Sequence, residues 1–117
     1  MWTIIKFNKK NFNLMKKELI ARNDSLTSFY QPLIKVQKQN KNKLFFKELP
    51  LLGNYIFCYN INFSDQNFIS SLKNIKGIEY ILRGYISSQL DIKKFIKRCK
   101  QSQNKDGFLS YKFYDLV

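Results

Sequence analysis

A turn followed by an aromatic strand, at residues 50–60 (Pro-Leu-Leu-Gly-Asn-Tyr-Ile-Phe-Cys-Tyr-Asn), constrains the fold more than any other stretch of this chain. Pro50 fixes its own backbone angle φ and Gly53 can adopt a positive φ, so the stretch opens with a turn. Side chains then alternate between the two faces of a strand, Tyr55, Phe57 and Tyr59 against Ile56 and Cys58. Because both faces are apolar, we expect this strand at the centre of a sheet. Its aromatic face then needs a helix, a nucleic-acid base or a protein partner to cover it.

The size and composition of the chain indicate one folded domain. A chain of 117 residues can bury a core without disulfides or metals, and a hydrophobic content of 44% is typical of a globular protein. No apolar run approaches the roughly 20 residues of a membrane span. The first six residues have the composition of a strand and lack the layout of a signal peptide, so we expect a cytoplasmic protein.

A strong positive charge suggests a polyanionic or acidic partner. The formal net charge is +13 and the isoelectric point is about 9.8. Of the 21 basic residues, only Arg22, Arg83 and Arg98 are arginine. Arginine is the residue suited to bidentate reading of bases, whereas lysine gives salt-sensitive attraction that is independent of sequence. We therefore expect that the protein works near nucleic acid and does not recognise a particular base sequence.

The residues that carry enzyme chemistry are few and scattered. The chain has no histidine, and Cys58 and Cys99 are far apart, which excludes Cys/His zinc spacing, Ser-His-Asp triads and Cys-His dyads. The eight acidic residues form no paired motif, and no glycine-rich phosphate loop is present. We expect no enzymatic activity, no cofactor, no metal and no small-molecule substrate.

The residue pattern of the first half of the chain predicts a strand, a helix and a hairpin. Residues 2–7 are apolar on both faces of a strand, and a helix follows from an N-cap at Asn11 to Arg22. Residues 27–37 have strand composition, although Pro32 predicts an edge position or a bend. A polar loop at residues 37–43 then leads to a short returning strand at 44–48. The hairpin has a basic tip, which could equally be a solvated loop.

The second half reads as a helix, a strand and a helix. Ser64 is the expected N-cap of a helix that Lys76-Gly77 closes. Residues 78–83 read as a strand, and Ser88 opens a capping box before a helix with an apolar stripe: Ile92, Phe95, Ile96 and Cys99. The order predicts an α+β fold. We expect a mostly antiparallel four-stranded sheet with flanking helices, ferredoxin-like, with an inserted β-hairpin.

Three segments together resemble the N-terminal (NGN) domain of the NusG/RfaH family of bacterial transcription elongation and antitermination factors. Trp2-Thr3-Ile4-Ile5 is similar to the tryptophan-led first strand of that domain. The segment from Pro50 to Phe57 is similar to its Pro-Leu-Phe-Pro-Gly/Asn-Tyr-hydrophobic-Phe motif, with Leu52-Gly53 in place of Phe-Pro. The segment from Lys76 to Arg83 is similar to its Arg-Gly-Val-led strand.

The resemblance implies a domain that binds RNA polymerase through an apolar hollow placed on the clamp helices of the β′ subunit, beside upstream DNA. The residues that match the hollow are Ile4, Leu52, Tyr55, Phe57 and, from the last helix, Ile96. The RfaH branch also contacts the β-subunit gate loop with polar residues early in its second helix, where this chain has Ser70 and Ser71.

The family pattern also divides the chain. Residues 1–100 correspond to the NGN domain. Residues 101–117 are expected to be a linker-like tail leading to the small KOW β-barrel of the family, which this chain lacks.

Lysines that flank the expected helix ends beside the docking face are the candidates for weak, sequence-indifferent contact with upstream or non-template DNA: Lys9, Lys10, Lys73 and Lys76.

The aromatic strand also admits two interpretations that involve no polymerase. An RRM-like RNA-binding module stacks bases on sheet aromatics, but its signature places an aromatic residue directly after glycine, where this chain has Asn54. Alternatively, the domain's own helices cover one or two of the three aromatic residues.

Overall fold

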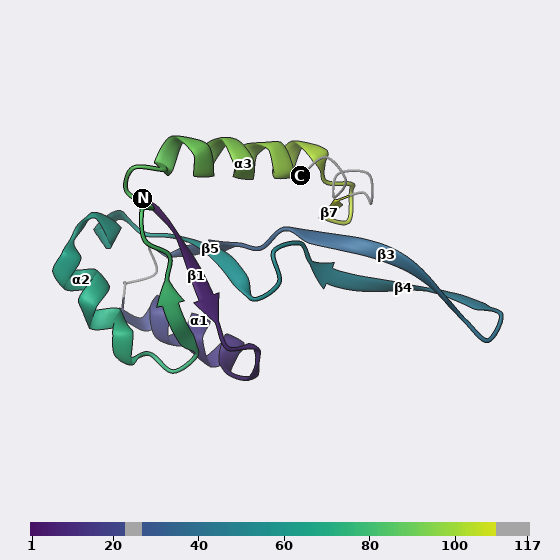
Figure 1. Cartoon of the computed structure of the whole chain (residues 1–117), viewed down its shortest axis with the longest axis horizontal. Coiled ribbons are helices and arrows are strands. Elements are labelled where there is room, and N and C mark those ends of the chain that lie inside the picture. Colours follow the sequence, from purple (N-terminus) through teal and green to yellow (C-terminus); the bar gives the residue numbers. More distant parts are fainter. Residues whose placement is uncertain (23–26, 110–117) are drawn as a thin grey trace.

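The computed structural model describes residues 1–22 and 27–109 and shows an α+β fold with two sheets (Figure 1). The larger sheet is antiparallel and has four strands in the order β2-β5-β1-β6: Ser28–Tyr30, Tyr55–Tyr59, Trp2–Phe7 and Ile78–Ile81. The smaller sheet has the order β4-β3-β7: Lys43–Pro50, Leu33–Asn40 and Phe108–Leu109. The predicted fold class is therefore confirmed, and the arrangement is compatible with a ferredoxin-like fold.

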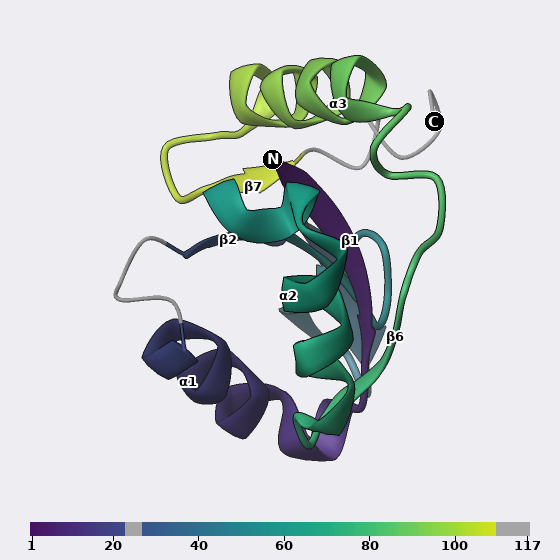
Figure 2. The ribbon, with the colours of Figure 1, turned by 90° about the vertical axis from the view of Figure 1, so that its left-hand side faces the viewer.

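Helices cover both faces of the four-stranded sheet. Helices α1 (Phe12–Arg22) and α2 (Gln66–Ser71) lie on one side and α3 (Gln89–Ser102) lies on the other (Figures 1 and 2). Alternate residues of β1 are buried and those between them are half-buried, so neither face of the strand is open, as the two-sided apolar pattern predicts. One core includes buried side chains from the sheet, α1 and α3, among them Ile5, Phe57, Met15 and Ile92, and the partly buried Phe68 of α2 packs against it.

The helix starts differ from those expected because nearby polar residues compete for the capping position. Asn8, not Asn11, accepts a hydrogen bond from the Lys10 backbone and caps a 3-10 turn, η1 (Lys9–Asn11), that precedes α1. Asp65, not Ser64, caps α2 by accepting from the Asn67 backbone. Helix α2 is also shorter than expected: it ends at Ser71, and the following residues form a 3-10 turn, η3 (Leu72–Asn74).

The start of α3 is held by glutamine instead of serine. The Ser88 side chain makes no capping hydrogen bond. The Gln89 amide donates to the carbonyl oxygens of Trp2 (2.6 Å) and Tyr85 (2.8 Å), and its oxygen accepts from the Trp2 backbone N–H (2.8 Å). The predicted capping box is wrong, and the side chain that replaces it ties α3 to the first strand.

Pro32 divides the expected strand at residues 27–37 between the two sheets. Strand β2 ends before it and β3 begins after it, while the Pro32 carbonyl oxygen accepts from the Leu51 backbone (2.8 Å). Strands β3 and β4 then form a long hairpin that projects from the body (Figure 1), and the chain measures 54 × 30 × 23 Å. The predicted polar loop at 37–43 is only a two-residue turn, at Lys41 and Asn42.

Part of the expected tail belongs to the fold. Helix α3 continues to Ser102, and β7 pairs in parallel with β3 at Leu33 and Ile34. Leu109 is buried with Ile34 and Cys99 in a second core. The expected boundary at residue 100 therefore lies inside a packed unit, and residues 110–117 of the tail lie outside the described residues. Over the described part of the chain, no helix is long and apolar enough to span a bilayer.

Candidate functional site

The middle of the aromatic strand is covered by the domain's own helix. Phe57 is only 3% exposed, and its ring lies 5.8 Å from that of Phe95 on α3 and 6.5 Å from that of Trp2. Ile96, from the same helix, is 5% exposed. Both residues were expected on an open docking surface, and that expectation is corrected: they are core residues, because α3 crosses the sheet over Phe57.

Tyr55, at the start of the same strand, is less buried than Phe57. It forms a cluster of polar and aromatic side chains with two residues of neighbouring strands. Lys6 pairs with Tyr55 on one side and with Tyr80 of β6 on the other, so the three side chains share a face. The two tyrosine hydroxyls are 2.9 Å apart. The Lys6 Nζ atom lies 5.2 Å from the centroid of the Tyr55 ring and 6.0 Å from that of Tyr80. We call these three residues the tyrosine cluster.

The tyrosine cluster is open to solvent and carries one net charge at neutral pH. Tyr80 is 46% exposed and Tyr55 is half-buried. The hydrogen bond with Tyr55 raises the pKa of the Tyr80 hydroxyl, with smaller contributions from burial and from nearby charge. Tyr80 therefore stays protonated and Lys6 supplies the charge. Two amphipathic rings beside an ammonium group suit contact with a partner that offers both apolar and acidic side chains.

Two of the expected docking residues border this cluster. Ile4 neighbours Lys6 on the same face of β1, and Leu52 lies in the turn before β5; both are half-buried against the main core. The Asn54 carbonyl oxygen of that turn accepts from the Phe7 backbone (2.9 Å), which holds the turn at the same end of β1. We call Ile4, Leu52 and the tyrosine cluster together the docking surface.

Sequence reasoning missed Lys6 and Tyr80. Alternation within residues 78–83 shows that Tyr80 shares a face with Ile78, but it does not show which face of the sheet this is. The strand register alone places Tyr80 beside Lys6.

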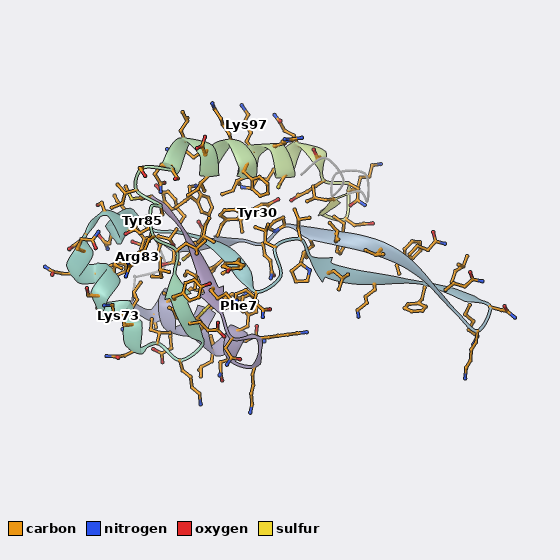
Figure 3. All side chains as sticks on the ribbon, in the orientation of Figure 1. Phe7, Tyr30, Lys73, Arg83, Tyr85 and Lys97 are labelled. Carbon is orange, nitrogen blue, oxygen red and sulfur yellow. The ribbon has the colours of Figure 1, made fainter. Side chains whose placement is uncertain are left out.

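Three of the four lysines expected to contact DNA lie on two neighbouring turns of the body. The Asn8 backbone donates to the Gly77 carbonyl oxygen (2.7 Å), which brings the turn that carries Lys9 and Lys10 next to Lys76. All three lysines are exposed. Lys73 is also exposed, on η3, and Figure 3 shows it at the end of the molecule away from the hairpin.

A groove of about 810 Å³ lies between α2–η3 and strand β6 with the loop that follows it. Its lining includes apolar, aromatic and basic side chains: Ile69, Leu72, Lys73, Tyr80, Arg83 and Tyr85. Figure 3 shows Lys73, Arg83 and Tyr85 on this side of the molecule. The Tyr85 hydroxyl donates to the Phe63 carbonyl oxygen (2.8 Å), which fixes that wall.

The serines expected to contact the gate loop lie on α2. The Ser71 hydroxyl donates to the Phe68 carbonyl oxygen (2.6 Å), so it is engaged within its own helix. Ser70 is exposed.

Neither protein-family models nor curated proteins give a match to this chain. Within the described ranges, no three His, Cys, Asp or Glu side chains come together where they could hold a metal ion.

Proposed function

We propose that this chain is the polymerase-binding domain of a transcription elongation or antitermination factor, acting in the cytoplasm. It binds the clamp helices of the β′ subunit through the docking surface, lies beside upstream DNA and modulates pausing or termination. One observation carries the proposal: the three segments that resemble the NusG/RfaH family, far apart in sequence, lie on the adjacent strands β5, β1 and β6. Their side chains therefore meet on one sheet.

The docking surface has the chemistry that helix recognition requires. Ile4 and Leu52 supply apolar area, and Tyr55 and Tyr80 add rings whose hydroxyls already bond to each other. Helices that lie across such a surface concentrate binding energy in a few aromatic residues, tyrosine among them. The buried ring of Phe57 fixes the strand beneath, so the surface is preorganised and little ordering is needed on binding.

RNA stacking is the competing function, and the position of α3 makes it the weaker of the two. An RRM-like surface needs its central aromatic residues open to bases. Phe57 occupies that central place and α3 covers it, while Tyr59 packs edge-on against Trp2 at 5.3 Å. Tyr55 and Tyr80 remain open, but they are bonded to each other at one end of the sheet.

The test compares tyrosines at the two ends of one strand. Tyr55→Ala removes a ring from the docking surface, and Tyr59→Ala removes a ring on the same face at the far end. We expect Tyr55→Ala to weaken binding to an isolated β′ clamp-helix fragment by about 2–4 kcal/mol. Leu52→Ala should weaken it less, and Tyr59→Ala should leave it unchanged. Titration calorimetry measures the affinity, and thermal unfolding checks that each variant is folded.

Two outcomes would overturn the proposal: a parent protein that does not bind the fragment, or a folded Tyr55→Ala variant that binds as the parent does. If the parent instead binds single-stranded RNA and Tyr55→Ala abolishes that binding, base stacking is the function of this surface.

A further inference from the structure

The hairpin formed by β3 and β4 leaves large apolar side chains uncovered. We call residues 35–47 the outer ribbon. Leu44 is 66% exposed, Phe46 is 61% exposed and Phe45 is 42% exposed. Along β4 every residue except Leu49 is exposed. Uncovered apolar side chains grouped on a projecting element are typical of a binding surface.

The same ribbon is strongly basic. From residue 35 to residue 47 the sequence reads Lys-Val-Gln-Lys-Gln-Asn-Lys-Asn-Lys-Leu-Phe-Phe-Lys, without an acidic residue. Lys41, Lys43 and Lys47 are exposed. Glu48, which pairs with Lys35 at the base of the ribbon, is the acidic residue nearest to it along β4. The mixture of uncovered aromatic rings and positive charge toward the tip points to a polyanion that also offers apolar contact, which is the chemistry of nucleic acid.

The register places an aromatic ring on each face of the ribbon, but Lys43 and Lys47 on one face only. Phe46 pairs with Gln37 on one face, where the Lys35 Nζ atom lies 5.4 Å from the Phe46 ring centroid. Phe45 is the preceding residue and points to the opposite face, which it shares with Lys43 and Lys47. A flat stacking platform for single strands would gather its rings on one face. A ribbon with a ring on each face instead fits between two walls.

The tip of the ribbon is narrow enough to enter such a space. Only two residues connect the strands, Lys41 (φ +47°) and Asn42 (φ +66°), in the left-handed conformation of a tight hairpin turn. The major groove of B-form DNA is about 12 Å wide and admits a two-stranded β-ribbon. Phosphates line both of its walls, and sugars and base edges offer apolar contact between them.

We propose that the outer ribbon is a nucleic-acid-binding element that enters a groove of duplex DNA. Its lysines contact the phosphates that line the groove, and Leu44, Phe45 and Phe46 pack against the groove interior. Strand addition to the β4 edge by another protein is disfavoured, because lysines along an exposed edge oppose such pairing. The ribbon is at the far end of the molecule from Lys73 (Figure 3), so this contact is separate from the one expected of Lys73. It also requires no polymerase.

The first experiment removes charge from the ribbon and compares this variant with one that removes the same charge elsewhere. The ribbon variant is Lys41→Gln/Lys43→Gln/Lys47→Gln. The control is Lys93→Gln/Lys94→Gln/Lys97→Gln, on the exposed side of α3, where Figure 3 shows Lys97 pointing away from the sheet. Binding to a random-sequence duplex of about two helical turns is followed by fluorescence anisotropy between about 50 mM and 200 mM salt.

We expect the ribbon variant to bind at least about tenfold more weakly at low salt, with a log–log salt slope shallower by about 0.9 for each phosphate that it no longer neutralises. The control should change affinity and slope much less. Equal effects in the two variants would mean that only net charge attracts DNA, and the proposal would be wrong.

The second experiment removes apolar contact without changing charge. Leu44→Ser/Phe46→Ser should weaken duplex binding several-fold while the salt slope stays as in the parent. Because both side chains are exposed, the thermal midpoint should not move. Unchanged affinity in this variant, or tighter binding of the parent to single-stranded RNA than to duplex, would overturn the groove proposal.

A crosslinking readout locates the contact directly. Gln39→Cys places a thiol on the exposed outer ribbon, and Ser70→Cys places one on α2 as the control. The native thiols, Cys58 and Cys99, are buried, so a benzophenone maleimide should label the new cysteine. We expect photocrosslinks to duplex DNA from Gln39→Cys and few from Ser70→Cys. The reverse pattern would contradict the proposal.

Discussion

The body of the molecule and its outer ribbon both contain strands rich in apolar side chains. These side chains are mostly buried in the body and mostly exposed in the ribbon. Strand β1 buries every second residue, whereas β4 exposes nearly all of its residues. Phe57 and Phe46 make the contrast concrete, since one ring lies under α3 and the other lies in solvent. The helices make the difference, because α1, α2 and α3 cover both faces of the larger sheet and the ribbon extends beyond them (Figure 1).

The contrast indicates that packing within the body stabilises the fold, whereas the ribbon is available to contact a partner. An isolated two-stranded hairpin is marginally stable at best in water. The base of the ribbon is anchored by the second core, through Ile34, Cys99 and Leu109. Beyond that anchor nothing in the described chain covers Leu44 or Phe46. The apolar side chains of the ribbon therefore add little to folding and remain free for a partner.

The largest expected effect is the difference between the two phenylalanines. Phe57→Ala empties a site among Trp2, Tyr30 and Phe95 and should cost about 3–5 kcal/mol of unfolding free energy. Phe46→Ala should cost less than about 0.5 kcal/mol, because the ring is exposed. Urea unfolding measures both. A similar cost for the two variants would show that the ribbon is packed in solution and would break the contrast.

Two glycines outside the ribbon test the close packing of the body at the level of the backbone. A Cβ atom on Gly77 (φ +104°) would lie 2.8 Å from the Asn11 carbonyl oxygen and 2.9 Å from the Met15 Cβ atom. Gly77→Ala should therefore destabilise the body by about 2–4 kcal/mol, through crowding added to left-handed strain. The control is Gly53→Ala (φ +64°), which has open space around it and should cost about 1–2 kcal/mol. Equal losses in thermal unfolding would argue against close packing of η1 on Gly77.

Much of the body could be predicted because its signals are local and redundant. Two-sided apolar strands at 2–7, 55–59 and 78–81 require a covered sheet, and the stripe through Ile92 and Ile96 requires a buried helix face. The capping residues could not be predicted, since Asn8 and Asn11, or the adjacent Ser64 and Asp65, are equally suitable.

The ribbon and the site depend on distant contacts that a sequence pattern does not contain. Residues 37–43 are polar and read as a loop, yet pairing from Leu33 to Asn40 extends the strands to a two-residue turn. The aromatic pattern shows that Tyr55 and Phe57 share a face, but only the path of α3 decides that Phe57 is covered and Tyr55 is left open.

A buried thiol makes the stability of the body depend on pH. Burial raises the pKa of Cys58 from its ordinary 9.0 to about 12. The unfolded chain therefore loses this proton at a lower pH than the folded one. The stabilisation is complete below the ordinary pKa and declines as pH rises toward the folded pKa, by about 1.4 kcal/mol per pH unit.

Cys58→Ala should flatten this part of the decline, although it lowers stability throughout by leaving a small cavity. Urea unfolding between about pH 8 and pH 11 under reducing conditions measures the difference in slope. Tyr30, whose pKa burial raises to about 12, titrates in both proteins and so cancels in the comparison. Parallel pH profiles for parent and variant would mean that the thiol is accessible to water in the folded protein.

The smallest expected effect lies in the turn of the ribbon. Lys41 adopts φ +47° and Asn42 adopts φ +66°, a conformation in which Asn-Gly is strongly preferred. Lys41→Asn/Asn42→Gly should stabilise the hairpin by about 0.5–1 kcal/mol. Amide hydrogen exchange should therefore slow in the part of β3 and β4 between the Val36–Lys47 pair and the turn, while the exchange rates of β1 stay the same. Lys41→Gln is the matched control, because it removes the same charge without favouring the turn.

The same double substitution also separates shape from charge in the ribbon: if a better-formed tip with one lysine fewer binds duplex DNA more tightly than Lys41→Gln does, the narrow turn itself contributes to binding. Faster exchange in the double variant would show that the ribbon does not form this turn in solution.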